Sequence, residues 1–324
     1  MTTPLPAIIK ALRGDFFCLP FGGNDRAFNG EKHPVHGETA NSKWDFESLE
    51  SRDGRTTLHL SLQTEIRRGR VDKRITLVEG QNALYSEHVI SGMRGPMGLG
   101  HHAMLKFPEA PGSGVISTSP ILGGQVFPGD FESPENGGYS SLKSGAEFES
   151  LEKVPTRDGQ FADLTRFPAR RGFEDLVMVV SDPGLPFAWT AVAFPKERYV
   201  WFALKDPRVL RETVFWISNG GRHYPPWSGR HLGVMGIEDV TAYFHCGLAQ
   251  SAATNPLAEK GIPTCVNLDP EKPFSVRYIM GIVTLPAGFD RVKRIERADQ
   301  RDGIVLHAVS GKHTKARVNL QYLE

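Results

Sequence analysis

The chain has 324 residues, of which 40% are hydrophobic and 23% are charged. This balance excludes a mainly disordered chain and allows either one large domain or two ordinary ones. Lys and Arg number 38 and Asp and Glu number 37, and no basic block stands out. We therefore expect no nucleic-acid partner and no membrane partner.

Three cysteines, Cys18, Cys246 and Cys265, lie far apart and form no C-x-x-C pair. This pattern predicts neither a disulfide framework nor a zinc knuckle, so we expect a reducing compartment. Lys10 and Arg13 interrupt the first apolar stretch, which is not typical of a signal peptide. No run approaches the ~18 apolar residues of a membrane span. The sequence therefore predicts a cytoplasmic protein.

Apolar and polar residues alternate with a period of two, which predicts strands along most of the chain. In chain order these are 57–62, two strands around a turn at 80–82, 187–194, 199–204, 276–285, and a C-terminal hairpin of 304–309 and 316–322. Residues 108–159 are rich in Gly, Pro, Ser and Glu, which predicts long loops between short strands, as a rim or lid over a site.

Helical signals are few. Asp206 followed by Pro207 is typical of one capped turn, and 289–298 have the spacing of a short amphipathic helix. We therefore predict an all-β protein. It is expected to be one large antiparallel β-sandwich domain over 1–324, with a helix and hairpin extension over 287–324.

Three segments carry side chains suited to chemistry, although no P-loop, dinucleotide-binding glycine motif or G-x-S-x-G elbow occurs. Residues 31–44 are dense in groups that bind hydroxyls. Residues 97–107 contain His101 and His102, which must face opposite sides of a strand. Residues 215–241 contain Trp216, Trp227 and Glu238. Taken singly, each residue has a structural explanation, because strand glutamates are usually solvated and tryptophans usually pack in cores.

Together, these segments resemble the galactose mutarotase-like (aldose 1-epimerase) superfamily. GLGHHAMLKF is similar to the family strand that carries the general acid, which the resemblance assigns to His102. HPVHGETANSKW is similar to the family's HP-x-HG stretch, which places His36 at a substrate-contacting histidine. GIEDVT is similar to the strand IEP-x-T, with Asp239 in place of the proline, and this places Glu238 at the general base.

The resemblance, over residues 15–285, also implies a sugar-binding set. FEDLV is similar to an acidic strand that holds sugar hydroxyls, with Asp175 as the candidate, and Arg26 is the match for the family's sugar-binding arginine. Aromatic rings stack on sugars, and amide and guanidinium groups bind hydroxyls. The predicted substrate-binding residues are Arg26, His36, Asn41, Trp44, Asp175, Trp216 and Arg222, with Trp227 as a further stacking candidate.

The implied reaction interconverts the α and β anomers of a small-molecule carbohydrate. A carboxylate removes the proton of the C1 hydroxyl, and an imidazole on the opposite side of C1–O5 protonates the ring oxygen. The ring opens, rotates and closes without a metal or other cofactor. We expect His36, His102 and Glu238 to converge in one cleft of a galactose mutarotase-like sandwich.

Two alternatives stay open. One is a metal-dependent cupin-type enzyme, because the spacing of His33, His36 and Glu38 suits imidazole and carboxylate ligands. The other is a carbohydrate-binding protein on the same fold that has lost the epimerase activity.

Overall fold

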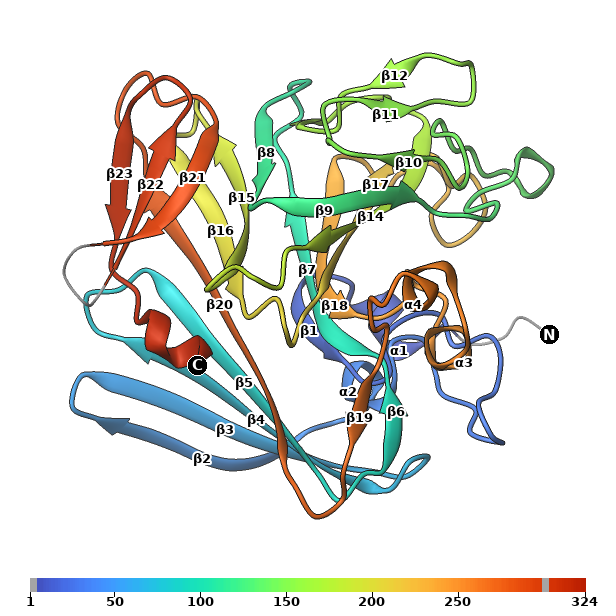
Figure 1. Ribbon diagram of the computed structural model, residues 1–324, viewed down its shortest axis with the longest axis vertical. Coiled ribbons are helices and arrows are strands. Elements are labelled where there is room, and N and C mark those ends of the chain that lie inside the picture. Colours follow the sequence, from blue (N-terminus) through green and yellow to red (C-terminus); the bar gives the residue numbers. More distant parts are fainter. Residues whose placement is uncertain (1–4, 299–302) are drawn as a thin grey trace.

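The structure, a computed structural model, describes residues 5–298 and 303–324. Within these residues strand content exceeds helix content several-fold. Two large sheets dominate the molecule (Figure 1), and every pair of neighbouring strands in the described sheets is antiparallel. The prediction of a large antiparallel β-sandwich is confirmed.

The first sheet has seven strands and carries the candidate site. Across the sheet they are β1 (Gly14–Cys18), β7 (Leu99–Lys106), β18 (Val234–Thr241), β17 (Glu212–Asn219), β14 (Phe173–Ser181), β9 (Ile121–Val126) and β10 (Glu147–Phe148).

The second sheet has nine strands. In order they are β13 (Arg166–Phe167), β8 (Gly114–Thr118), β15 (Ala188–Phe194), β16 (Tyr199–Lys205), β20 (Phe274–Thr284), β5 (Ala83–Ser91), β4 (Gly69–Val78), β3 (Arg55–Thr64) and β2 (Asp45–Arg52).

Smaller elements complete the described fold. The short sheets are β11 (Val154–Pro155) with β12 (Phe161–Ala162), β19 (Val266–Leu268) with β6 (Gly95–Met97), and β21 (Val292–Arg297) with β22 (Ile304–Ala308) and β23 (His313–Ala316). The helices are α1 (Ala7–Lys10), α2 (Glu38–Asn41), α3 (Leu248–Ala252) and α4 (Pro256–Glu259), and the 3₁₀ turns are η1 (Pro134–Asn136) and η2 (Leu320–Leu323).

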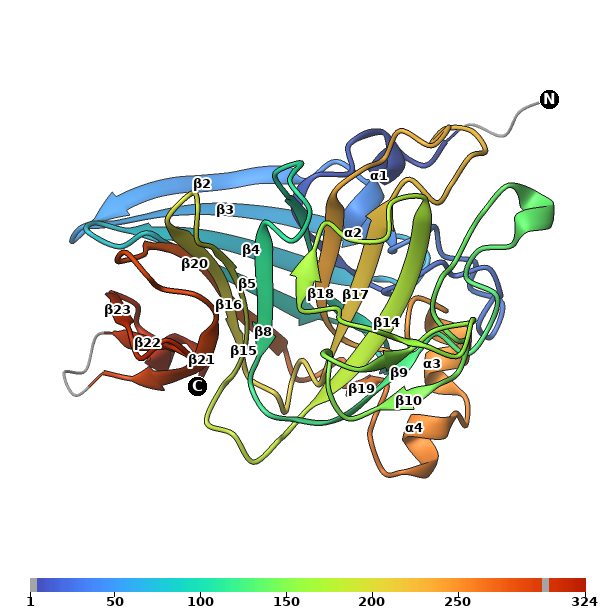
Figure 2. The same ribbon diagram turned by 90° about the horizontal axis from the view of Figure 1, so that it is seen from above.

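The main core lies between the two sheets. Phe215 and Ile237 of the seven-stranded sheet pack against Val192 and Phe194 of the nine-stranded sheet. Because side chains alternate along a strand, the neighbouring residues of β17 and β18 point to the other face of their sheet. Figure 2 shows that face of β14, β17 and β18 beside α1 and α2. The candidate site is built there.

The C-terminal sheet covers the other face of the nine-stranded sheet. Ile304 and Leu306 of β22 are fully buried and belong to the same cluster as Phe202 and Ile279 of β16 and β20. Figure 1 shows β21–β23 beside β15 and β16. The central strands of the nine-stranded sheet are therefore buried on both sides.

Two sequence predictions in this C-terminal region are wrong. Residues 292–297 form strand β21 and not a helix. A register shift between Val292 and Arg294 turns Val292 and Ile295 both inward, and this spacing of three residues resembles that of a helix. The hairpin partner of β22 ends at Ala316. Asn319 then caps the turn η2 by accepting from the Gln321 N–H, and this turn buries Leu320.

None of the helices in the part of the chain that the structure describes combines the length and the apolar character needed to cross a bilayer.

Candidate active site

Four adjacent strands present the floor of the site. Leu176 of β14, Trp216 of β17, Glu238 of β18 and His102 of β7 all line one pocket. Their positions follow from the register, since Trp216 pairs with Leu176 on one side and with Gly236 on the other. The period-two alternation thus brings side chains that are distant in sequence onto one face.

His102 and Glu238 lie side by side on neighbouring strands. They stand between the cross-strand pairs Ile237–Ala103 and Val240–Gly100, and His102 Nε2 is 3.1 Å from Glu238 Oε1. A Cβ on Gly236 would lie 2.6 Å from the same carboxylate oxygen, so this glycine leaves the room that Glu238 occupies. The two side chains thus contact each other directly instead of facing each other across a cavity.

Burial shifts both side chains toward their neutral forms. Both residues are 2% exposed. Desolvation raises the pKa of Glu238 well above its usual value. Desolvation, with a smaller contribution from His36, lowers the pKa of His102 well below its usual value. The Nδ1 atom of His102 has no hydrogen-bond partner within the described residues.

The remaining wall of the pocket is largely aromatic and apolar, and the cavity measures about 160 Å³. This volume lies below the ~300–1,000 Å³ of typical sites for drug-sized ligands, so it suits one small ring. The further lining residues are Ile9, Leu12, Val35, His36, Phe131, Arg222, Trp227 and His245.

Arg222 is held by aromatic rings and carboxylates. Its guanidinium carbon lies 5.1–5.2 Å from the ring centroids of Phe131, Trp216 and Trp227, a cation–π arrangement. Its Nε donates to buried Glu132. The guanidinium group is therefore fixed at the pocket by packing and by charge, as a recognition group needs to be.

Glu174 lies next to this arginine. Its Oε1 accepts from Trp216 Nε1 at 2.8 Å and is 3.9 Å from Arg222 Nε. Burial raises the pKa of this carboxyl group to about 7, although Arg222 pulls in the opposite direction. The neutral form of this carboxyl group is therefore favoured more than in a solvated glutamate.

Comparison with solved structures identifies the fold. A proposed aldose 1-epimerase from Escherichia coli K12 superposes with a TM-score of 0.54 at 15% identity, over 84% of each chain. One from Klebsiella pneumoniae gives 0.57 at 14% identity, over 83% of this chain and 62% of the other. A galactose mutarotase related enzyme from Lactobacillus acidophilus gives 0.51 at 15% identity, over 84% of each chain.

The chain has the galactose mutarotase-like fold. At the sequence level, no protein-family model and no curated protein matches it. At these identities the likeness concerns the fold, and the roles of single residues must come from the site itself.

Within this mutarotase-like fold, His36, Trp216 and Arg222 of the predicted substrate-binding set reach the pocket. Burial and, to a smaller extent, His245 lower the pKa of His36 to about 3, so its imidazole is neutral. The ring of His36 lies edge-on to that of His102, with their centroids 4.9 Å apart.

Asp175 does not reach the pocket. Its carboxylate points to the other side of β14 and accepts from the backbone N–H groups of Ser141 and Leu142, both at 2.9 Å. The acidic side chain on the pocket face is its neighbour Glu174. The prediction that Asp175 lies at the pocket is therefore wrong, because one step along a strand reverses the face.

Three other predicted residues also lie outside the pocket lining. Arg26 is an exposed loop residue. Trp44 packs at the main core, where its Nε1 donates to the Thr39 carbonyl and Lys73 lies over its ring. The side chain of Asn41 forms its hydrogen bonds with backbone groups.

The opposite orientations expected for the two adjacent histidines are confirmed. His101 faces the core, where its Nδ1 lies 2.8 Å from Asp15 Oδ2 and its ring stacks on Tyr278. Asp239 likewise points away from the pocket, and its carboxylate lies 2.7 Å from Lys205 Nζ. The aspartate that stands in place of the family's proline therefore forms an ion pair inside the sandwich and does not line the pocket.

The donors of the cupin-type alternative do not gather. His33 contacts Glu31, the Glu38 carboxylate accepts from the N–H groups of residues 65 and 66, and His36 alone enters the pocket. Among the described residues, no group of three or more His, Cys, Asp or Glu side chains is placed to hold a metal ion.

Sequence reasoning missed Glu174, Glu132 and His245. His245 is partly exposed, but its Nδ1 is buried and has no partner within the described residues, and desolvation lowers the pKa of its imidazole to about 4. Glu132 lies in the loop-rich region 108–159, which was expected to cover a site. The position of Glu174 could have been inferred, because alternation along β14 places it on the same face of the sheet as Leu176, which lines the pocket.

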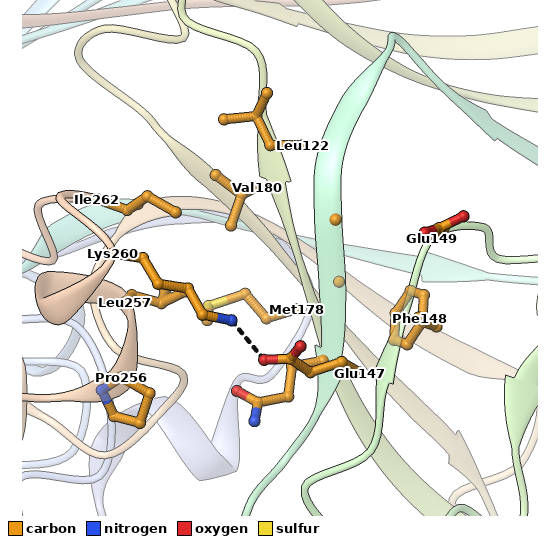
Figure 3. A pocket seen from close by; sticks show the side chains of 13 residues that line it. Leu122, Glu147, Phe148, Glu149, Met178, Val180, Pro256, Leu257, Lys260 and Ile262 are labelled. Atoms are coloured by element: carbon orange, nitrogen blue, oxygen red, sulfur yellow. Dashed lines mark hydrogen bonds and ion pairs between the residues drawn. The ribbon is translucent and has the colours of Figure 1, made fainter.

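A second cavity, of about 370 Å³, opens on the same side of the sheet at β9, β10 and α4. Figure 3 shows Lys260 and Glu147 paired across it. These two side chains and Glu149 are exposed, so their charges are screened by solvent. The smaller pocket, with its buried acid and base, is the stronger candidate for catalysis.

Proposed function

We propose that the protein is an aldose 1-epimerase-type isomerase that interconverts the anomers of a monosaccharide without a cofactor. The observation that carries this proposal is the buried contact between His102 and Glu238 at the floor of an aromatic pocket. The mutarotase-like fold supports it, because several proteins with this fold are described as aldose epimerases or as related to mutarotases.

The proposed chemistry begins with proton transfer within the pair. Burial favours a neutral imidazole and a neutral carboxyl group. Passage of the carboxyl proton to His102 Nε2 creates a carboxylate that can accept the C1 hydroxyl proton and an imidazolium that can protonate the ring oxygen. Their mutual attraction in a dry site offsets part of the cost of the two charges.

The side-by-side arrangement is compatible with this role. O1 and O5 of a pyranose are both bonded to C1, so two neighbouring groups on one face can reach both oxygens once the sugar separates them. The α-to-β change then follows ring opening to the aldehyde and rotation about C1–C2. Because the two side chains only transfer protons, one at O1 and one at O5, no nucleophile is required.

Recognition of the sugar is assigned to the aromatic, arginine and histidine side chains that line the pocket around the His102–Glu238 pair. Trp216 and Trp227 line the pocket with Arg222 over both rings, and Arg222 offers a fixed guanidinium. His36 and His245, both neutral, can donate to or accept from hydroxyls. A small neutral or weakly polar ring fits these groups and the cavity volume.

The proposal is tested by saturation-transfer NMR on a panel of aldoses, sugar phosphates and uronic acids. At catalytic protein concentration, α/β exchange of at least one sugar should exceed the uncatalysed rate by ~10²-fold or more. Binding of a sugar with exchange at the uncatalysed rate would instead favour a carbohydrate-binding protein on this fold. Activity that chelators abolish and one metal restores would favour the metal-dependent alternative.

A further inference from the structure

Asn41 connects two separate walls of the pocket without entering it. Its Nδ2 donates to the carbonyl oxygens of Val35 at 2.7 Å and Gly37 at 2.8 Å, and its Oδ1 accepts from the Ile8 N–H at 3.2 Å. Two carbonyls on one side and an N–H on the other fix the orientation of the amide. All three partners are backbone groups.

The first wall is the turn that carries His36. Val35 and Gly37 are the residues on either side of His36, and Val35 and His36 both line the pocket. His36 has a φ of +59°, a left-handed conformation that non-glycine residues adopt only where their surroundings enforce it. The two hydrogen bonds from Asn41 hold the peptide groups that flank this residue.

The second wall is the N-terminal segment. Ile9 and Leu12 line the pocket, and the segment 7–12 includes α1, a helix of four residues without a side-chain cap. A helix this short is not stable by itself. Its described attachments include the buried side chain of Ile8, the packing of Leu12 against a core cluster that contains Trp216, and the bond from the Ile8 N–H to Asn41.

We propose that Asn41 is a positioning residue that ties the segment 7–12 to the His36 turn, and that this segment is a cover over the pocket. With the tie intact, Ile9 and Leu12 close the pocket and His36 is held at His102. With the tie broken, the segment lifts and the His36 turn relaxes. The statement that the cover admits a sugar rests on the proposed function, whereas the tie itself does not.

Limited proteolysis tests the attachment of the cover. Lys10 and Arg13 are exposed trypsin sites in or beside the segment, and cleavage requires the segment to leave its place. Asn41→Ala removes all three hydrogen bonds and should speed cleavage at both sites by ~10-fold or more. Asn41→Asp places a carboxylate oxygen against the Val35 and Gly37 carbonyls, so it breaks the tie at the His36 turn and should also speed cleavage.

Histidine NMR tests the hold on His36. The imidazole has a pKa of about 3 because it is desolvated in the pocket, with His245 and His102 as its titratable neighbours. Both Asn41→Ala and Asn41→Asp remove the donors to Val35 and Gly37. In both variants the His36 pKa should rise toward the ~6.5 of a solvated histidine.

Asn219→Ala is the matched control. This buried asparagine also bonds to backbone groups, donating to the Ala169 carbonyl and accepting from the Gly233 N–H. It is the last residue of β17. Its loss should lower stability, yet leave both the trypsin sites and the His36 titration unchanged. The control thereby separates the tie from a general loss of stability.

Wild-type cleavage rates and an unshifted His36 pKa in Asn41→Ala would overturn the proposal. If that variant does not fold, the test rests on Asn41→Asp and on hydrogen exchange of the wild-type Ile8 amide, which should be protected. Exchange of that amide at the rate of an open chain would also overturn it. These measurements need no sugar, so failure of the epimerase assay leaves them unaffected.

Discussion

The proposed acid and base of the candidate site are two single residues on neighbouring strands. His102 and Glu238 are buried in contact with each other, and desolvation moves the pKa of each toward the uncharged form. Such opposed shifts in one pocket are typical of groups that exchange protons with a substrate. The role of each can therefore be tested by removing its titration while keeping its shape.

Glu238→Gln should leave sugar binding intact and slow anomer exchange by ~10²-fold or more. The amide fills the same space and can hydrogen-bond, but it cannot accept a proton as a carboxylate does. Exchange NMR measures the rate, and ligand-observed NMR measures binding of the same sugar.

His102→Gln should lose a similar factor, and the double variant should be little worse than either single one, because both groups act on one transition state. Multiplicative losses, or exchange at the wild-type rate in Glu238→Gln, would remove the catalytic assignment.

Glu174 makes stability depend on pH. Its pKa is raised from 4.5 to about 7 in the folded protein. Between these values the folded chain keeps a proton that the unfolded chain has released, so stability is highest below the window and falls as the pH rises through it. The loss amounts to at most about 3 kcal/mol.

Glu174→Gln resembles the protonated form and can still accept from Trp216 Nε1. Urea unfolding at about pH 5 and about pH 8 should show a smaller loss of stability in the variant than in the wild type. Glu212, whose pKa burial raises to about 8, titrates in the same sense in both proteins and cancels in the comparison. Equal losses would show that Glu174 is ionised throughout.

Residue types indicated chemistry better than they indicated location. His36 and Arg222 were expected at the site and line it, whereas Trp44 and Asn41 have equally suitable side chains and point elsewhere. Their positions depend on the turn at 34–37 and on α2, whose geometry rests on contacts with distant backbone. A local pattern of polar residues does not contain that information.

At the scale of elements, strand β14 carries two adjacent acidic residues that point to opposite faces of the sheet. Glu174 lies on the pocket side of the sheet, against Trp216 and Arg222, and Asp175 faces the opposite way and holds residues 141 and 142 through two backbone N–H groups and the Ser141 hydroxyl. Adjacent residues of one strand thus support opposite faces of the sheet.

Asp175→Ala should lower the free energy of unfolding by about 3 kcal/mol, because it leaves buried donors unpaired. Anomer exchange by the folded protein should stay near the wild-type rate. Glu174→Gln serves as the matched variant one residue away, with its effect on the site rather than on the loop. A loss of exchange in Asp175→Ala without a loss of stability would place Asp175 in sugar recognition.

Strand positions were predictable from alternation, but interruptions of the ladder were not. The strands expected at 187–194 and 199–204 correspond to β15 and β16. The bulge in β21 converts the spacing of its buried residues from two to three, which is why a helix was expected there. A bulge is fixed by the partner strand, so the sequence of one strand alone does not reveal it.

At the scale of the whole molecule, the C-terminal sheet is part of the core. Leu306 is fully buried against the nine-stranded sheet, so Leu306→Ala should cost about 2–5 kcal/mol. Lys293→Ala, on the exposed side of β21, should stay within about ±0.5 kcal/mol.

We further expect one cooperative transition by circular dichroism and by tryptophan fluorescence in the wild type and in both variants. Two separated transitions would mean that residues 287–324 form a unit of their own. In that case the extension would not belong to the single domain expected from the sequence.

The strand order has a consequence for how the protein is made. β7 and β18 are neighbours in the sheet, yet ten other strands are synthesised between them. Pairings this distant in sequence form slowly and late, after most of the chain has left the ribosome. A nascent chain therefore holds His102 for a long interval without Glu238, and any protein released early has a pocket floor that lacks Glu238. Completion of the seven-stranded sheet and the appearance of the proposed activity should consequently be one event during refolding.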